Sequence, residues 1–289
     1  MQKNSNSLNE VQNNTVEFNP VTVYGSGIKT DLKDFSSEQF STLLTASLLH
    51  HLINLPPAVQ KYSLATVPEK YKKYFTSLLK EDENSINKIH YNSLEQSHQQ
   101  IVFLVIPPNT VLNEPIIITT NIRDGSASTH LIIIVEENST ASIIERVRSD
   151  EQTYALTSFK EMILSKNASL TIYQKHRLHS NTFHFSKNKT QQSTNSKCQL
   201  IDSLSGGKSV QHHTYFELQE PFSTAHHYLA FNAPKDSDYD LISQAEQSAP
   251  ESESKLICKG LIQDEGKALF QGKVNISPKA YSSKGEQRT

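Results

Sequence analysis

The sequence predicts a mainly β chain built as a β-solenoid, with a small helical region in front of it. Short runs rich in Val, Ile and Thr follow one another from about residue 98, and Asn, Asp, Gly and Pro separate them. Apolar residues make up only 36% of the chain and tryptophan is absent, which favours a thin, elongated core. Two similar segments, Ala141–Ile143 and Ala168–Leu170, each follow an Asn and lie 27 residues apart, a spacing typical of one solenoid coil.

The chain divides into a predicted helical region over residues 1–97 and a predicted β region over residues 98–289. Ser36 and Gln39 have the spacing of a capping box, so a helix is expected to begin there and to end before Pro56. Its apolar face would consist of Phe40, Leu43, Leu44, Leu48 and Leu52. Thr66 and Glu69, with Pro68 between them, predict a second helix. Its apolar stripe would consist of Tyr71, Phe75, Leu78 and Leu79.

Composition excludes several classes of function. A net charge of -2 gives no reason to expect a nucleic acid or an anionic membrane surface as a partner. The polar start resembles no signal peptide, no apolar run is long enough to span a membrane, and two cysteines make no disulfide framework. The cytoplasm is therefore the expected location. Gly206, Gly207 and Lys208 lack the spacing of a phosphate-binding loop, and no paired catalytic carboxylates or serine elbow appear. No catalytic residue is predicted.

Histidines are frequent, and each is a candidate metal ligand. His176, His179 and His184 lie close in sequence, and His212-His213 and His226-His227 are adjacent pairs. Adjacent residues of a strand point to opposite faces, so neither pair is expected to hold one ion. Residues such as His212 and His226 are candidates for a ladder on neighbouring coils. Because surface histidines explain the pattern equally well, no metal site is predicted.

The C-terminal stretch carries the strongest pattern. Two strand-like runs flank Asp264-Glu265-Gly266, where Gly266 is expected to serve a turn, and Gly272 interrupts the second run, where we expect a bend or bulge. This stretch resembles the SufB/SufD family, the scaffold proteins of the SUF iron–sulfur cluster assembly system. The residues that match the family signature are Ser254, Lys259, Gly260, Gly266, Phe270, Gly272 and Gln287. Gly206-Gly207-Lys208 further resembles a middle coil of the SufD branch.

The resemblance implies a right-handed parallel β-helix core, and a role as a SufD-like scaffold subunit rather than an enzyme. It also implies a SufB-like subunit as heterodimer partner, and a SufC-like ABC-type ATPase that docks through a further C-terminal segment. The family pattern continues beyond Thr289, so the core is expected to be incomplete at its C-terminus. No cofactor is expected to bind this chain stably, because the family builds a transient iron–sulfur cluster at the interface between partners.

Cys198 is the candidate sulfur acceptor, since the SufB branch uses a β-helix cysteine in roughly this region. The neighbouring Lys197 is expected to lower the pKa of the thiol and so to favour the sulfur-accepting thiolate. Cys258 is expected to share a strand face with Leu256 and to serve packing. The alternative for Cys198 is likewise a small buried core residue.

A carbohydrate-binding or carbohydrate-cleaving β-solenoid is the alternative reading of the whole chain. Such proteins line a groove with aromatic residues and carboxylates. Tyr215, Phe216 and Tyr228 are the candidates for stacking on sugars. The missing tryptophan, acid pair and export signal weigh against this alternative.

Overall fold

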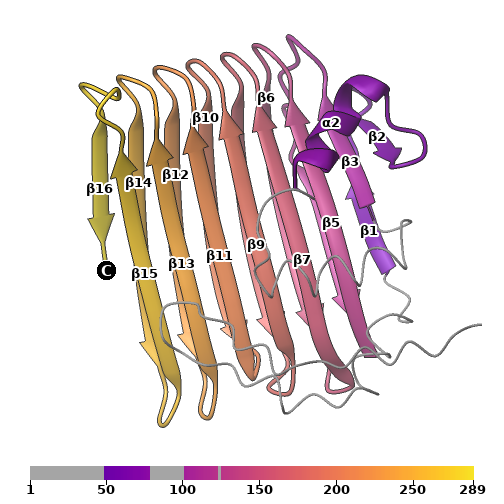
Figure 1. Ribbon diagram of the computed structural model, residues 1–289. Helices are drawn as coiled ribbons and strands as arrows, with labels where there is room; N and C mark the ends of the chain where they lie inside the picture. Colours follow the sequence, from indigo (N-terminus) through magenta and orange to yellow (C-terminus); the bar gives the residue numbers. More distant parts are fainter. Residues whose placement is uncertain (1–48, 79–100, 123–124) are drawn as a thin grey trace, which may run out of the picture.

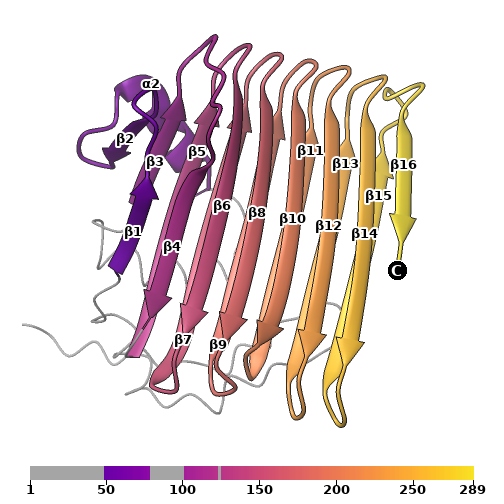
Figure 2. The same ribbon diagram turned by 180° about the vertical axis from the view of Figure 1, so that it is seen from behind.

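A computed structural model describes residues 49–78, 101–122 and 125–289 of the chain. In this part the chain forms a parallel β-solenoid of about six turns, so the predicted mainly β, coiled architecture is confirmed. Two eight-stranded sheets face each other, and each coil contributes one strand to each sheet (Figure 1, Figure 2). The side chains between the two sheets form the core.

The strand order of both sheets follows the coil. The first sheet consists, in spatial order, of β1 (Leu49–Asn54), β4 (Ile116–Ile122), β6 (Thr140–Ser149), β8 (Ser169–Leu178), β10 (Lys197–Gly206), β12 (Thr224–Ala233), β14 (Glu253–Ile262) and β16 (Lys284–Arg288). The second consists of β2 (Gln60–Ser63), β3 (Ile101–Ile106), β5 (Gly125–Val135), β7 (Thr153–Leu164), β9 (Phe183–Gln192), β11 (Ser209–Leu218), β13 (Asp238–Gln247) and β15 (Lys267–Ile276). Neighbouring strands from β3 onward are parallel, whereas β1 and β2 pair antiparallel with β4 and β3.

The helix predicted from Thr66, Pro68 and Glu69 is confirmed as α2 (Glu69–Leu78), which lies at the N-terminal end of the solenoid (Figure 1). Tyr71 on this helix is buried and packs with Phe103 in one apolar cluster, and its hydroxyl donates to Glu136 Oε1 at 2.9 Å. Leu79, predicted as part of the same stripe, lies outside the described residues. Across residues 49–78, 101–122 and 125–289, no helix has the length and apolar character needed to cross a membrane.

For the helix predicted to begin at Ser36, the expected C-terminal part is wrong. Residues 49–54, expected to continue a helix that began at Ser36, form strand β1 and pair with β4. Hydrogen bonds to the edge of β4 outweigh the helical period of the leucines, because local propensity is a weaker force than sheet pairing. Residues 36–48 lie outside the described part of the chain.

Side chains alternate between inward and outward positions along each strand, and the inward ones form the core. In β8 every second residue is buried, from Leu170 and Ile172 to Leu178, and the residues between them face outward. The strands stack in register, so inward positions of successive coils form continuous columns. One such column runs from Ile143 through Ile172 and Leu200. Two apolar clusters fill the two margins of the interior, and Leu200 belongs to one and Leu204 to the other.

An asparagine ladder lines the corner where the chain passes from the second sheet to the first. Asn109, Asn138, Asn167 and Asn195 all have positive φ, a backbone conformation that asparagine tolerates better than most residues. The Nδ2 group of each later asparagine donates to Oδ1 of the one before, at 3.1, 2.8 and 2.8 Å. Each coil therefore repeats both the backbone turn and the side-chain bond.

This ladder corrects the repeat length read from the sequence. Successive ladder asparagines are 29, 29 and 28 residues apart, and Ala141 pairs with Leu170 rather than with Ala168. The 27-residue echo compared positions of adjacent coils that are two residues out of register. The asparagine before each segment, at 138 and 167, was the correct marker.

Glycines close the opposite corner between β10 and β11. Gly206 and Gly207 have φ of 79° and 87°. A Cβ atom on Gly206 would lie 1.8 Å from the carbonyl oxygen of Leu178 on the previous coil. The Gly206-Gly207-Lys208 segment is thus a tight solenoid corner, in agreement with the rejection of a phosphate loop.

Phe222 occupies the ladder corner one coil after Asn195 and is a strained, half-exposed residue, with φ of 63°. We expect Phe222→Asn to stabilise the protein by about 1 kcal/mol, because asparagine tolerates this conformation and extends the ladder to Asn195. The midpoint of thermal unfolding should rise by about 2–4 °C. Phe222→Ala is the control, since it removes the exposed ring without relieving the backbone. A midpoint for Phe222→Asn no higher than that of Phe222→Ala contradicts this explanation.

Candidate functional site

Polar side chains run through the middle of the solenoid interior, between the two apolar clusters. Each is at most 6% exposed, and each points inward from one of the two facing sheets. We call this group the polar stripe. It consists of Lys160, Gln174, His176, His184, Ser186, Asn188, Asp202, His212, Thr214, His227 and Ser243.

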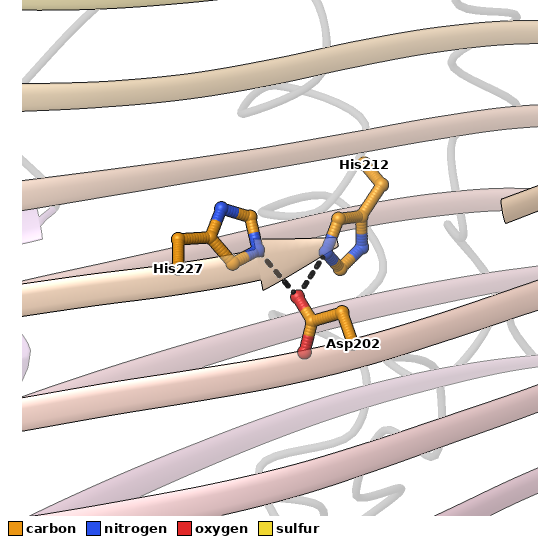
Figure 3. A group of neighbouring side chains, drawn as sticks. All are labelled: Asp202, His212 and His227. Carbon is orange, nitrogen blue, oxygen red and sulfur yellow. Dashed lines mark hydrogen bonds and ion pairs between the residues drawn. The ribbon is translucent and has the colours of Figure 1, made fainter. Parts of the chain in front are cut away.

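Asp202 on β10 is the centre of the polar stripe. Its Oδ2 atom lies 2.8 Å from Nε2 of His212 and 2.9 Å from Nε2 of His227 (Figure 3). His227 comes from the neighbouring strand β12, where it pairs with Leu200, two residues before Asp202. His212 reaches across the interior from β11 of the second sheet. The three ligand atoms lie within 4.8 Å of one another, so this group could hold a metal ion.

The electrostatics of the centre follow from burial and from these bonds. Burial alone would raise the pKa of Asp202, but the bonds to His212 and His227 outweigh it and hold that pKa far below its ordinary value. For His212 burial is the larger effect and lowers the pKa, although the bond to Asp202 opposes it. The favoured state is thus an ionised carboxylate beside a neutral His212 imidazole.

Two serine hydroxyls lie within hydrogen-bond distance of the Nδ1 atoms of these two imidazoles. Ser186 Oγ lies 2.6 Å from Nδ1 of His212, and Ser243 Oγ lies 2.7 Å from Nδ1 of His227. Because an ionised carboxylate can only accept, Nε2 of each ring carries a proton and donates to Asp202. Nδ1 then accepts from the serine hydroxyl. Asn188 bonds to Thr214 at 3.2 Å beside the same cluster.

Two further imidazoles extend the stripe toward the N-terminal coils. The ring centroids of His176 and His184 are 4.9 Å apart, and that of His176 is 5.9 Å from His212. Burial, the largest effect, lowers the pKa of His176 to about 4 and that of His184 well below its ordinary value. Neither ring nitrogen of His176 has a hydrogen-bond partner among the described residues.

Lys160 forms the other end of the polar stripe. Its Nζ donates to Gln174 Oε1 at 2.8 Å and is ion-paired with Glu145. Lys160 and Glu145 are 6% and 8% exposed, respectively. The buried lysine is thus neutralised locally by Glu145.

The histidine ladder predicted from the sequence is wrong in one member. His212 points inward, but His226 lies on the other sheet with its side chain on the outer face, 26% exposed and 3.5 Å from Glu253. Its neighbour His227 is the residue that reaches the interior. The rule that adjacent residues face opposite ways is confirmed, whereas no sequence pattern indicates which member of each pair faces inward. Asp202 was not recognised as their shared partner.

Cys198 lies in the core, on the same inward face of β10 as Asp202, and is 2% exposed. Burial, and secondarily the charge of Asp202, raises the pKa of its thiol far above the ordinary value. The expectation that Lys197 lowers this pKa is wrong, because Lys197 is exposed on the opposite face of the strand. The role of Cys198 as sulfur acceptor stays a prediction. Cys258 and Leu256 are both buried on one face of β14, as expected, and burial raises the pKa of Cys258 to about 12.

The signature residues gather on the last coils and serve packing of one coil on the next. Gln287 on β16 is exposed and reaches β15; with its amide oriented so that the oxygen faces that strand, the oxygen accepts from the backbone amides of Lys273 and Val274, at 3.1 and 2.8 Å. Gly272 lies beside this amide: a Cβ there would be 3.5 Å from Gln287 Cδ and 3.3 Å from Phe270 Cε1. The predicted bend or bulge at Gly272 is wrong, because β15 pairs with β13 without a register shift.

The other signature residues are Ser254, Lys259, Gly260 and Gly266, and both glycines lie against the previous coil. Ser254 is buried and donates to Gln247 Oε1 at 3.2 Å, and Lys259 is exposed. A Cβ on Gly260 would lie 2.0 Å from the ring of Phe231 on the previous coil. Gly266 follows the turn at Asp264-Glu265, as predicted, and a Cβ there would lie 2.6 Å from the carbonyl oxygen of Pro234.

The aromatic residues considered for sugar stacking do not share a surface. Phe216 is 1% exposed and belongs to the interior core. Tyr215 is on β11 and Tyr228 on β12, and these strands belong to opposite sheets. Because inward residues alternate with outward ones, the two tyrosines face away from the solenoid on opposite sides.

Comparison with known proteins agrees with the signature. Residues 117–289 match the family model described as SUF system FeS cluster assembly, SufBD core domain. No curated protein matches the chain.

Burial should make Cys198 unreactive in the folded protein. In a Cys258→Ser variant, we expect a disulfide reagent such as DTNB at pH 8 to modify Cys198 at least about 100-fold more slowly in the native state than in urea. A raised pKa leaves the thiol protonated, and each unit lowers the thiolate fraction about tenfold. Rapid stoichiometric labelling of the native variant contradicts the buried position.

The two signature glycines should respond differently to alanine. We expect Gly260→Ala to lower the free energy of unfolding by about 1–3 kcal/mol, because the new methyl group overlaps the ring of Phe231. Gly272→Ala meets only side-chain atoms at 3.3 Å or beyond and should cost less than about 1 kcal/mol. Urea unfolding measures both variants. A second variant, Gly260→Ala with Phe231→Leu, should recover part of the loss, and equal losses for both glycines contradict this interpretation.

Proposed function

This chain belongs to the SufBD core family, whose members take part in iron–sulfur cluster assembly by the SUF system, and we propose that it acts there as a SufD-like scaffold subunit. The match over residues 117–289 is the observation that carries the proposal. The subunit would work in the cytoplasm with a SufB-like partner. A SufC-like ABC-type ATPase would supply the energy, docked through a segment that follows the core.

The architecture supports a scaffold rather than an enzyme. Stacked coils paired in register along their whole length make a stiff body, which suits a platform that holds other subunits at fixed positions. Both cysteines are buried with raised thiol pKa values, so neither is poised as a nucleophile in this conformation. The cluster would form transiently at the interface with the partner and would not remain bound to this chain.

The SufD-like assignment rests on two features of the middle coils. The Gly206-Gly207-Lys208 corner resembles the SufD branch, and its backbone conformation requires glycine at both positions. The thiol of Cys198 lies in a core where its thiolate is disfavoured, which argues against the SufB-like acceptor role in this state.

Co-expression with the SufB-like subunit of the same organism tests the proposal. We expect the two to co-purify, because the family to which this chain belongs takes part in one assembly system. Absence of co-purification for the unmodified chain contradicts the scaffold proposal.

A further inference from the structure

We propose that Asp202, His212 and His227 form a binding site for one divalent transition metal ion, such as Zn²⁺ or Fe²⁺, inside the solenoid. The site goes beyond the assembly role, because it lies wholly within this chain and needs no partner subunit. Two imidazoles and one carboxylate are a donor set that zinc and ferrous iron accept, whereas Ca²⁺ and Mg²⁺ prefer oxygen donors alone.

The distances fit a small displacement on binding. Oδ2 of Asp202 is now 2.8 and 2.9 Å from the two Nε2 atoms. Ligand atoms around a tetrahedral ion at about 2.0–2.1 Å are roughly 3.3 Å apart. Each Oδ2–Nε2 distance would therefore lengthen by about half an ångström, while the two Nε2 atoms, now within 4.8 Å of each other, would take up the same spacing; side chains cover such displacements without a change of rotamer.

Buried polar atoms without a hydrogen-bond partner lie at and beside the proposed metal site. Oδ1 of Asp202 has no hydrogen-bond partner among the described residues, although the residue is only 1% exposed. Both ring nitrogens of His176 are also without a partner, and its ring lies 5.9 Å from that of His212. Buried polar atoms are nearly always paired with protein, water or an ion, so these orphans indicate a missing ligand.

Charge favours a cation at this position. Oδ2 of Asp202 contacts Nε2 of His212 and of His227, and no lysine or arginine of the described residues forms a salt bridge with this carboxylate. Lys160, the lysine of the stripe, is already bonded to Glu145 and Gln174. A divalent ion would replace two hydrogen bonds to the carboxylate with direct coordination and offset the buried negative charge.

Ser186 and Ser243 allow the two imidazoles to bind a metal ion through Nε2 without a net loss of protons. On binding, each Nε2 becomes a metal ligand and its proton is lost, while Nδ1 gains one, so each imidazole remains neutral. Ser186 and Ser243 then accept from Nδ1–H instead of donating to it, because a hydroxyl can serve either role. Such a second bond from a ligating imidazole is the usual support of metal-bound histidine.

The ion itself is the first probe. The full chain is unfolded in urea and refolded with excess Zn²⁺ or, separately, Co²⁺, because the site is closed in the folded state. After desalting, we expect about one metal ion per chain by mass spectrometry. We also expect visible Co²⁺ absorption bands without the charge-transfer band of a thiolate ligand. Less than about 0.1 ion per chain overturns the proposal, and a thiolate band overturns it in favour of a cysteine site.

Variants then assign the ligands. Asp202→Asn and His227→Gln should each lose at least about 90% of the retained metal, whereas His226→Gln should keep it. His226 is a matched control because it is adjacent on β12 but faces outward. Circular dichroism confirms that each variant has refolded. The Co²⁺ spectrum of the unmodified chain tests the site even where a variant does not fold, and full metal retention by refolded Asp202→Asn overturns the assignment.

Discussion

In-register stacking of the coils is the constraint on which the rest of the structure depends. β8, β10, β12 and β14 pair without a shift, so Gln174, Asp202, Leu229 and Cys258 stand one above another. Each coil satisfies the backbone groups of the next, and each inherits the same two corners. An inward residue consequently has neighbours fixed by the coils before and after it. The same constraint explains why one corner repeats positive φ from Asn109 to Ser282 even where, as at Phe222, the residue suits it poorly.

This stacking makes the polar stripe an all-or-none arrangement. Asp202 stands between Leu200 and Leu204, which belong to different apolar clusters, so apolar side chains flank it on both sides along the strand. The carboxylate depends on His212 and His227, and these rings depend in turn on Ser186 and Ser243. A buried network of this kind is stable only while every member keeps its partner. Removal of Asp202 would leave two imidazoles with unpaired Nε2 groups in the core.

The sequence predicted the periodic parts and failed where coils meet. Val, Ile and Thr runs between Asn and Gly turns predicted the strands, and the 27-residue echo together with the SufB/SufD resemblance predicted that they stack as a solenoid. The Thr66 to Glu69 spacing predicted α2. The coil length predicted from the sequence was two residues too short, because alanines of adjacent coils were aligned in place of the asparagines. Strand β1 was missed because pairing with β4 is a long-range effect. The Asp202 centre was missed for a related reason, since its members come from three strands and no sequence rule says which of His226 and His227 faces inward.

The polar stripe also bears on how the coils find their register. Apolar columns tolerate a slip of two residues, because Leu, Ile, Val and Ala replace one another with little change in burial. The stripe does not tolerate it. A two-residue slip of β12 that places Leu229 opposite Leu200 would put His227 opposite Cys198, out of reach of Asp202, and so leave a buried carboxylate with a single donor. Buried polar contacts thus oppose the very errors that the apolar core permits. A fixed register also keeps the outward side chains of successive coils in one arrangement.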